Sequence, residues 1–399
     1  MTNTYYREHE PVTPSFARPA GCPFDPSPEI TALRAELPVA RLAAPEGAPG
    51  VWLVTGYELV RKILADPRFS SRYETQCHPL MGAHLPPAPI GDLTGMDAPE
   101  HTRIRRMLAG KFTVRRMNQL TERATEITQA HLDAMEKQGP PADLVRVFAH
   151  PIPAQMICEL LGVPYEERDA FVGFAQSASN GDDLGTQLAA FAQLSEYLQA
   201  LARAKRADPT DDLLSDLTTS DLTEEELGGV AAFLLGAGLD TTANMLALGT
   251  FALLRNPAQS SALRDDPSLV DGAVEELLRY LSIATTGMRG VLADVELGGV
   301  PIKAGDTVIL AVNAANRDPA KFPDPDVLDL RRSTAGHLAF GHGIHQCLGQ
   351  QLARVEMRVA FPALLARFPS LRLAVPAEEV PLRDPIQIYG VHSLPVTWE

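Results

Sequence analysis

The segment FGHGIHQCLG, residues 340–349, places Cys347 among two histidines and three glycines. A cysteine in such a setting can be a metal ligand, a nucleophile, a redox thiol or a buried core residue. The other cysteines, Cys22, Cys77 and Cys158, are scattered without C-x-x-C spacing. This argues against a disulfide framework and against a zinc site of paired cysteines. Cys347 is therefore expected to act alone.

Residue types alone leave two chemistries open for Cys347. A cysteine hydrolase needs a base and an orienting acid, and His342 and His345 are the candidate bases. Alternatively, the thiolate binds iron, because a helix predicted over 347–367 would bring its N–H groups and its dipole to the sulfur and stabilise the anion. Zinc held by His342, His345 and Cys347 is disfavoured by the spacing and by the lack of a fourth ligand. The neighbouring glycines permit a close backbone approach to something flat or bulky.

A second candidate group lies in FLLGAGLDTTANMLALGTFALL, residues 233–254, which is apolar nearly all round and so predicts a buried helix. Its centre carries Asp240, Thr241 and Thr242, and threonine hydroxyls in helices can bond backbone carbonyls and bend the helix. A satisfied polar patch would explain the threonines. Asp240 needs another explanation, because a buried carboxylate is costly unless it is paired or used. We expect this acid and alcohol to pass protons or to hold a small ligand.

Two further charged groups have simpler competing explanations. Glu276 and Arg279 share a helix face at i,i+3, where an ordinary surface pair contributes about 0.2–0.5 kcal/mol. The pair would be more than an ordinary surface contact if both side chains are buried and Arg332 joins them as a third charged group. Residues 101–117, HTRIRRMLAGKFTVRRM, contain six cations and no acid, which predicts a segregated basic surface. A solvated helix face is the usual explanation, but such a surface also suits an acidic partner or an anionic cofactor group.

A mainly helical fold with a small β-rich portion is predicted to position these groups. Residues 74–100 are rich in proline and glycine and read as a long loop of the kind that forms lids or binding segments. The β-rich parts are expected near 50–56, 288–312 and 380–398, with a closing hairpin over 386–398. Helices are predicted after residue 56 and over 100–139, 151–161, 166–178, 186–206, 223–254, 266–282 and 347–367.

Composition narrows the class of protein. The 399 residues are 45% hydrophobic and carry a formal net charge of -15, so nucleic acid and anionic membranes would both repel the chain. The N-terminus contains five prolines and no continuous apolar run that could act as a signal peptide or a spanning helix, which predicts a cytoplasmic protein. No repeat or linker divides the sequence, so one domain is expected over residues 1–399.

Together these segments resemble the cytochrome P-450 family, the haem-thiolate monooxygenases. The family signature F-x-x-G-x-H-x-C-x-G is matched by Phe340, Gly343, His345, Cys347 and Gly349, with Gly341 in its usual place. Other family segments follow in the family's order: MDAPEHTRIRR from residue 96, A-G-x-D-T-T at 237–242, E-x-x-R at 276–279, and the stretch from NRDP to PDPDVLDLRR that ends at Arg332. The resemblance implies the P-450 fold, with haem b between a long central helix and the cysteine loop.

The resemblance implies a role for each matched residue. Cys347 would be the axial thiolate of the haem iron, which favours O–O cleavage. Asp240 and Thr241 match the family's acid–alcohol pair, in which the alcohol hydrogen-bonds the oxygen being activated and the acid links that site to solvent. Glu276, Arg279 and Arg332 match the structural triad behind the haem. The remaining haem contacts would be His101, Arg105, Arg289 and His345 at the propionates, and Phe340, Gly341, Ala237 and Gly349 at the macrocycle.

The resemblance also implies where a substrate would lie. It would meet the loop 74–95, the central helix, the segment after the E-x-x-R helix and the C-terminal turn. The residues expected there are Leu234, Ala237, Thr241, Ile283, Ala284, Thr285, Gln387 and Ile388. Most are apolar, which predicts a hydrophobic organic substrate. The ending YGVHSLPVTW resembles actinobacterial members that tailor polyketides, macrolides or other secondary metabolites, with hydroxylation the first expectation and epoxidation the second.

The partners implied are O2 and a ferredoxin served by a reductase that oxidises NAD(P)H, with the enzyme itself a monomer. Ferredoxins are usually acidic, so the docking candidates are Arg103, Arg106, Lys111 and Arg115. Neither nucleic acid nor membrane is expected as a partner. Two rival functions are a peroxide-driven peroxygenase and a non-catalytic haem sensor or carrier. Known peroxygenases of this family replace the acid–alcohol pair, which is intact here, and a sensor or carrier would not need it.

Overall fold

The computed structural model describes residues 10–19, 21–111, 113–180, 184–383 and 388–399. Its longer helices are α1 (Pro28–Glu36), α2 (Tyr57–Ala65), α3 (Glu100–Ala109), α4 (Val114–Gln138), α5 (Pro151–Leu161), α6 (Arg168–Asn180), α7 (Leu184–Ala207), α8 (Leu213–Thr218), α9 (Glu224–Arg255), α10 (Pro257–Asp265), α11 (Val270–Leu281), α12 (Val312–Ala315) and α13 (Gln350–Arg367). Short helical turns are η1 (Tyr73–Thr75), η2 (Leu93–Gly95), η3 (Val145–Ala149), η4 (Tyr165–Glu167), η5 (Pro267–Leu269), η6 (Gly343–His345) and η7 (Ala377–Glu379). The predicted fold class, mainly helical with a small β-rich portion, is confirmed.

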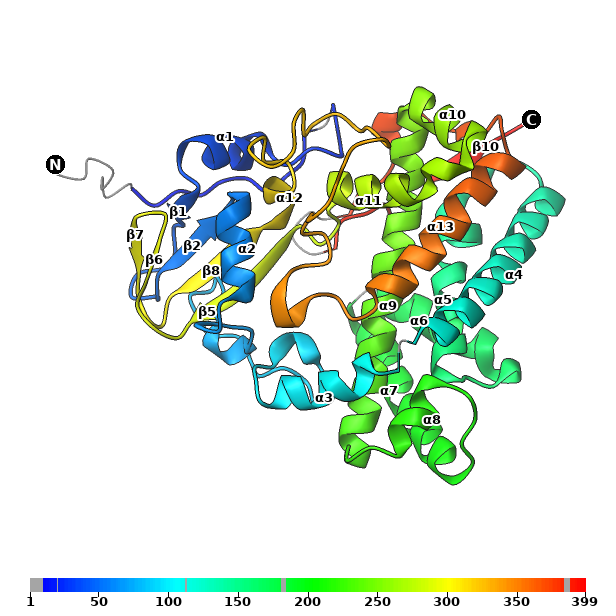
Figure 1. Cartoon of the computed structure of the whole chain (residues 1–399), viewed down its shortest axis with the longest axis horizontal. Coiled ribbons are helices and arrows are strands. Elements are labelled where there is room, and N and C mark those ends of the chain that lie inside the picture. The colour runs from blue at the N-terminus through cyan, green and yellow to red at the C-terminus, as the bar shows by residue number, and fades with distance from the viewer. Residues whose placement is uncertain (1–9, 20, 112, 181–183, 384–387) are drawn as a thin grey trace.

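Three small sheets form the β-rich part. Their strands are β1 (Val39–Arg41), β2 (Val51–Val54), β3 (Phe69–Ser70), β4 (Ala142–Asp143), β5 (Thr286–Val291), β6 (Val295–Leu297), β7 (Val300–Ile302), β8 (Thr307–Ala311), β9 (Arg372–Leu373) and β10 (Pro395–Thr397). The largest sheet has the order β1-β2-β8-β5-β3, with β2 and β8 parallel and the other neighbours antiparallel. It lies with α1 and α2 beside the helical part, where α4, α9 and α13 are prominent (Figure 1).

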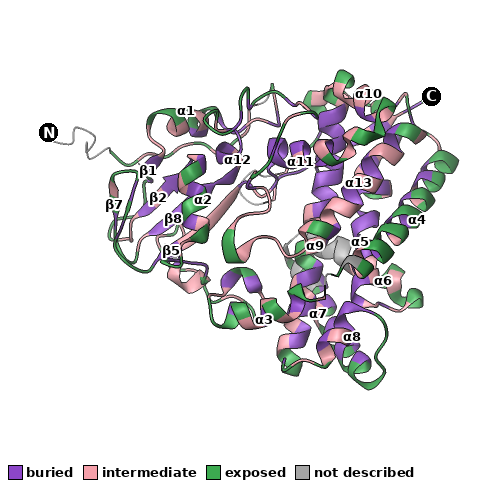
Figure 2. Cartoon of the chain, in the orientation of Figure 1, coloured by how far each residue is buried: buried purple, intermediate pink, exposed green. Residues whose placement is uncertain are grey.

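Helix α9 is the centre of the helical part, as its apolar sequence predicts. The helix begins at a capping box, in which Thr223 and Glu226 satisfy each other's backbone N–H groups, and it runs unbroken to Arg255. From Thr242 to Leu253 it is buried on all sides (Figure 2). Within the described part of the chain it is the one helix long and apolar enough to cross a bilayer, and 61% of that apolar window is buried inside the protein. Burial by neighbouring helices therefore accounts for its hydrophobicity.

The prediction of a single helix over 100–139 was wrong, because this segment forms two helices, α3 and α4. Helix α3 ends at Ala109, next to Gly110, and α4 begins at Val114. The side chain of Thr113 caps the new helix by accepting a hydrogen bond from the N–H of Arg116. The helix pattern continues through the break, so periodicity alone does not locate it.

The closing hairpin predicted over 386–398 lies partly outside the described residues, which resume at 388. Strand β10 pairs with β4 and β9, which lie in distant parts of the sequence. Upstream of it, Leu382 and Val391 form only an isolated antiparallel bridge. Alternation of apolar residues indicates a strand but does not identify its partner, so the pairing of β10 with β4 and β9 could not be predicted from this segment.

Candidate functional site

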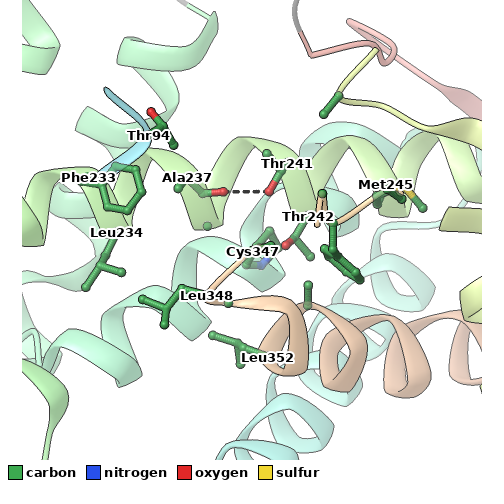
Figure 3. Close-up of a pocket in the computed structure, with 18 of the residues that line it drawn as sticks. Thr94, Phe233, Leu234, Ala237, Thr241, Thr242, Met245, Cys347, Leu348 and Leu352 are labelled. Atoms are coloured by element: carbon green, nitrogen blue, oxygen red, sulfur yellow. Dashed lines mark hydrogen bonds between the residues drawn. The ribbon is translucent and has the colours of Figure 1, made fainter. Parts of the chain in front are cut away.

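A largely apolar cavity lies between α9, the first turns of α13 and the loop that carries Cys347 (Figure 3). Phe233, Leu234, Ala237 and Thr241 line it from α9. Its remaining walls come from several other elements: Leu93, Thr94, His101, Arg105, Pro153, Ile157, Leu160, Leu278, Ile283, Ala284, Ala339, Phe340, Gly341, His345, Leu348, Gly349, Leu352, Ala353, Glu356 and Met357. Of the haem-contacting residues predicted from the sequence, all except Arg289 line this cavity.

The loop of Cys347 is held in place by its own backbone. The N–H of Cys347 donates to the carbonyl of Phe340 at 2.8 Å, which closes the loop three residues before α13 begins. Helix α13 thus begins later than the predicted 347. Gly343 has φ +76°, and a Cβ there would lie 2.4 Å from the carbonyl oxygen of Leu64, so the loop packs tightly on α2.

The electrostatics of Cys347 differ in part from the sequence-based expectation. The N–H groups of Gly349 and Gln350 favour the thiolate as predicted, and Arg105 and Arg354 act in the same direction. Burial is nevertheless the largest effect, and it raises the pKa of the Cys347 thiol. The protein by itself therefore favours the neutral thiol, and a bound metal cation would be needed to hold the thiolate.

Four side chains that can donate hydrogen bonds meet beside this cavity: His101, Arg105, Arg289 and His345, here called the donor cluster. The rings of His101 and His345 lie 4.1 Å apart between centroids. Burial and the charges of Arg289 and Arg105 lower the pKa of His345 to about 3, so its ring is neutral at physiological pH. The donor cluster contains no acid of its own.

The donor cluster has unused hydrogen-bonding capacity. His101 is 1% exposed, and neither ring nitrogen has a hydrogen-bond partner. Arg105 donates to the carbonyl of Gln346, and Arg289 to the carbonyl of Met288, so their positive charges meet no carboxylate in these hydrogen bonds. Unsatisfied buried nitrogens next to cations that form no hydrogen bond to a carboxylate fit an anionic ligand. The two propionates of haem, with iron at Cys347 and the macrocycle in the apolar cavity, match this donor set.

On α9 the acid and the alcohol are separated. Thr241 lines the cavity, and its hydroxyl donates to the carbonyl of Ala237 at 2.8 Å, as expected for a threonine that bonds the preceding turn (Figure 3). Asp240 does not line the cavity and is half-buried rather than fully buried. Its carboxylate is paired with Arg383, a partner that sequence reasoning missed.

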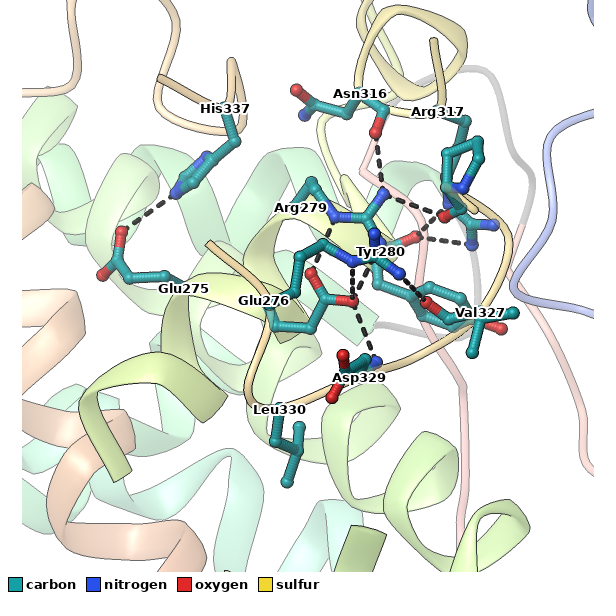
Figure 4. A network of polar contacts seen from close by, with 12 residues as sticks. Glu275, Glu276, Arg279, Tyr280, Asn316, Arg317, Val327, Asp329, Leu330 and His337 are labelled. Carbon is teal, nitrogen blue, oxygen red and sulfur yellow. Dashed lines mark hydrogen bonds and ion pairs between the residues drawn. The ribbon is translucent and has the colours of Figure 1, made fainter. Parts of the chain in front are cut away.

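Glu276, Arg279 and Arg332, here called the buried triad, lie together as the sequence suggested. Figure 4 shows Glu276 and Arg279 facing each other. The guanidinium of Arg279 donates two hydrogen bonds, of 2.7 and 2.8 Å, to the Glu276 carboxylate, and both side chains are 0% exposed. Arg279 also donates to the carbonyls of Asn316 and Pro325, while Arg332 donates to Glu276 at 3.1 Å. The triad does not line the cavity.

The segregated basic surface predicted for residues 101–117 was wrong. Acidic side chains from α8, its preceding loop and the start of α9 neutralise most of these cations. Arg103 pairs with Glu226 and Asp221, Lys111 with Asp216, Arg115 with Asp211, and Arg116 with Asp211 and Asp216. A cluster of cations in the sequence does not reveal the acids that the fold brings to it.

The cavity wall agrees only in part with the predicted substrate contacts. Leu234, Ala237, Thr241, Ile283 and Ala284 line the cavity. Thr285 is buried outside it, Ile388 pairs through its backbone with Ala284, and Gln387 lies outside the described residues. From the loop 74–95, Leu93 and Thr94 line the cavity.

The sequence did not single out Glu356, a carboxyl group that lines the cavity from α13. Its side chain is buried and one carboxyl oxygen has no hydrogen-bond partner. Burial raises its pKa well above the usual value, because the low-polarity surroundings favour the neutral acid over the carboxylate. The only local signal was an acidic residue on an otherwise core-facing helix position.

The competing explanations for Cys347 find little support in this geometry. Among the described residues, no three His, Cys, Asp or Glu side chains are grouped to hold a metal ion, which argues against a zinc site. His345 faces His101 in the donor cluster, and His342 lies at a surface depression with residues of α2. Neither histidine is among the groups that act on the pKa of the Cys347 thiol, so no hydrolase-like pair with the sulfur is described.

Comparison with known proteins agrees with this geometry. A family model described as cytochrome P-450 matches residues 189–387. Cytochrome P-450 105C1 of a Streptomyces species is 50% identical over 387 residues, spanning 94% of this chain and 96% of that protein. The cytochrome P-450 monooxygenase PikC of Streptomyces venezuelae is 45% identical over 383 residues, spanning 94% and 91%. The crystal structure of CYP105P1 in complex with filipin I has a TM-score of 0.88 at 44% identity, covering 98% of this chain and 99% of that one.

Proposed function

The chain belongs to the cytochrome P-450 family and is a haem-dependent monooxygenase, and on that premise we propose that it hydroxylates a hydrophobic secondary metabolite of the polyketide or macrolide class. The observation that carries this proposal is the apolar cavity, bounded by Thr241 on one side and by the loop of Cys347 on the other. The overall reaction inserts one oxygen atom of O2 into a C–H bond and releases the other as water, using two electrons and two protons. Epoxidation of a C=C bond is the second expectation.

Different residues of this chain would bind the haem, transfer protons and exclude water. Cys347 would hold the iron and the donor cluster would hold the propionates of haem b, which supplies oxygen activation when bound. Thr241 presents a hydroxyl inside the cavity, where it can hydrogen-bond oxygen and pass a proton. Asp240, on the outer side of α9, would exchange that proton with solvent. The apolar side chains around Ala237 exclude bulk water from the reacting centre.

The substrate class rests on the cavity and on the relatives. Phe233, Leu234, Ile283 and Ala284 give the cavity an apolar wall, which favours a hydrophobic molecule. A pentalenic acid synthase of Streptomyces avermitilis is among the similar proteins, and one similar crystal structure contains filipin I. An intact acid–alcohol pair favours oxygen-driven monooxygenation over a peroxygenase or a non-catalytic haem carrier.

The electrons would come from NAD(P)H through a reductase and a ferredoxin that docks near Cys347. Exposed Arg61 and Lys62 of α2 line a depression with His342, and Arg106 of α3 is also exposed. Within the described chain none of these three cations forms an ion pair, unlike Arg115. Exposed Ile344 lies on the same loop, three residues before Cys347. Of the sequence-based candidates, Arg106 is the one without an ion pair in the described chain, and we define the proximal patch as Arg61, Lys62 and Ile344.

We also propose an oligomeric state, a cellular location and a domain organisation for this enzyme. The enzyme would act as a monomer in the cytoplasm, with the whole chain as one P-450 domain. Nothing in the cavity or the proximal patch requires a second copy.

A spectral screen of hydrophobic natural products against the haem-loaded enzyme tests the proposed function. A substrate should displace water from the ferric iron and shift the Soret band, and the same compound should gain one oxygen atom when NAD(P)H, reductase and ferredoxin are supplied. Cys347→Ala should abolish the carbon monoxide spectrum typical of haem-thiolate proteins. Turnover with peroxide but not with ferredoxin would overturn the monooxygenase assignment in favour of a peroxygenase.

The docking surface is tested separately. Arg61→Glu combined with Lys62→Glu should raise the apparent KM for ferredoxin, because charge reversal weakens electrostatic steering. Arg115→Glu is the matched control, since that cation is already paired with Asp211. An equal effect of both changes would exclude the proximal patch.

A further inference from the structure

Glu275 is the neighbour of the triad residue Glu276 on α11, but its carboxylate belongs to a different set of contacts. The guanidinium of Arg354, on α13, donates to both of its oxygens, at 2.6 and 3.0 Å. His337 lies 3.0 Å from one of the same oxygens through its Nε2 (Figure 4). The carboxylate of Glu275 therefore joins α11 to α13 and to the segment that leads into the loop of Cys347.

His337 fixes the start of that loop. Its Nδ1 accepts a hydrogen bond of 3.2 Å from the N–H of Ala339, so its Nε2 carries the hydrogen and donates to Glu275. The His337 side chain is nearly buried. The backbone directly before Phe340 is thus tied to the carboxylate of Glu275.

Arg354 brings a positive charge to the same loop. Its guanidinium lies over the ring of Phe340, 4.6 Å from the ring centroid. Phe340 in turn accepts the N–H of Cys347 through its carbonyl. Arg354 also donates to the side-chain oxygen of Gln350 at 2.9 Å, in the first turn of α13. This cation therefore lies close to the sulfur, and its charge favours the thiolate form of Cys347.

Glu275 offsets part of that charge. Burial raises the pKa of Glu275, but hydrogen bonds from His337 and Arg354 outweigh burial and lower the pKa to about 2. The carboxylate is therefore ionised at physiological pH. Arg105, the other cation that favours the thiolate, donates to the carbonyl of Gln346 and has no carboxylate in that hydrogen bond. The field at Cys347 thus depends on one cation with a carboxylate partner and on one whose hydrogen bond goes to a carbonyl.

We propose that Glu275 tunes the reduction potential of the haem by limiting the positive charge that Arg354 presents to the Cys347 thiolate. One-electron reduction, with the electron supplied by ferredoxin, adds a negative charge at the iron and makes or breaks no bond. A nearby cation favours that state, and an ionised carboxylate beside the cation opposes it. Glu275 does not line the cavity, so it is a positioning residue. This inference rests on the iron ligation proposed for Cys347.

The competing explanation is a purely structural clamp, in which Glu275 and Arg354 only fasten the loop to α11 and α13. Loss of either side chain would then loosen the same contact, so both losses would move the potential in the same direction or leave it unchanged. The electrostatic role instead predicts shifts of opposite sign, because the two side chains carry opposite charges.

Spectroelectrochemical titration of the haem-loaded enzyme separates the two explanations. Glu275→Gln should change the equilibrium constant for one-electron reduction about three- to tenfold in favour of the ferrous state. Arg354→Gln should change it by a similar factor in favour of the ferric state. A tenfold change corresponds to about 59 mV for a one-electron couple. Shifts in the same direction, or no shift in Glu275→Gln, would overturn the proposal.

Charge-conserving variants keep the test informative if the neutral variants load haem poorly. Glu275→Asp and Arg354→Lys preserve the charges and should keep potentials close to wild type, whereas a clamp that needs the exact geometry would move them as far as the neutral variants.

Glu159→Gln is the matched control, because Glu159 pairs with Arg168 at 2.6 Å and does not line the cavity. The side chains of this pair are 17% and 18% exposed, comparable with 25% and 14% for Glu275 and Arg354. An equal shift in Glu159→Gln and Glu275→Gln would show that the effect is not specific to Arg354 and would also overturn the proposal.

The infrared stretching frequency of carbon monoxide on the ferrous enzyme gives a second readout. A thiolate that donates less electron density to iron leaves less for the bound carbon monoxide, so the frequency should rise in Glu275→Gln and fall in Arg354→Gln. Equal frequencies in the two variants would contradict tuning through the thiolate. If the wild type itself lacks the carbon monoxide spectrum typical of haem-thiolate proteins, the ligation proposed for Cys347 fails instead.

Discussion

The buried triad and the donor cluster are both groups of polar side chains enclosed by the same fold, but only one of them is complete. In the triad, every charged oxygen and guanidinium group of Glu276 and Arg279 has a protein partner (Figure 4). In the donor cluster, both nitrogens of His101 are unpaired and the two arginines have no carboxylate in their hydrogen bonds.

This difference separates scaffold from site. Buried charges that satisfy one another stabilise one arrangement of the chain and need nothing else. Buried donors without acceptors lower the stability of the haem-free protein. This stability is restored only when a ligand supplies the acceptors. The two groups should therefore respond in opposite ways when a member is replaced by an apolar residue.

The largest effect is expected in the buried triad. Arg279→Met leaves the Glu276 carboxylate buried beside only Arg332 and the N–H of Asp329, and it removes the donor to two carbonyls. We expect a loss of about 3–5 kcal/mol in the free energy of unfolding, with or without haem. Denaturant unfolding followed by circular dichroism measures it.

The control for that prediction is a pair on the surface. Arg367→Met breaks contacts to Asp133 and Glu136, both mostly exposed, and should cost no more than about 1 kcal/mol. A loss of the same size in both variants would show that burial does not distinguish the triad.

The next effect should have opposite signs with and without haem. His101→Leu removes two unsatisfied buried nitrogens, so the free energy of unfolding of the haem-free protein should rise by about 1–3 kcal/mol. The same change removes a donor to the haem, so haem transfer to apomyoglobin should become roughly tenfold faster, which corresponds to about 1.4 kcal/mol. If the haem-free protein is instead destabilised, His101 belongs to the scaffold.

The same contrast explains which parts of the fold and of the candidate site could be predicted from the sequence. The spacing around Cys347 and the pattern of α9 are local, so the haem-facing loop and the central helix could be predicted from them. The E-x-x-R spacing suggested the triad, but its burial came from the fold. Arg383 and Asp240 lie 143 residues apart in the sequence, and no local pattern indicates that they pair.

The errors and the missed strand pairing have a similar origin. The run of cations from 101 to 117 was read without the acids near α8 that neutralise it. The break between α3 and α4 falls where the helical period continues but Thr113 supplies a cap. The partners of β10 are strands whose positions are set by packing of the whole chain.

The smallest effect on stability is expected at Glu356. Its carboxyl group has one oxygen without a hydrogen-bond partner and also carries a titratable proton. Burial holds its pKa well above the usual 4.5, so as pH rises past 4.5 the unfolded chain loses this proton while the folded protein keeps it. Its contribution to stability is therefore full at low pH and declines as pH rises, by up to about 1.4 kcal/mol per pH unit. Glu356→Gln keeps the shape and the unpaired oxygen but not the titration, so the stability of this variant relative to wild type should increase as the pH rises above 4.5. Unfolding of both haem-loaded proteins across that range measures the difference, and a difference independent of pH would mean that the Glu356 carboxyl group finds a partner or water that the unpaired oxygen does not reveal.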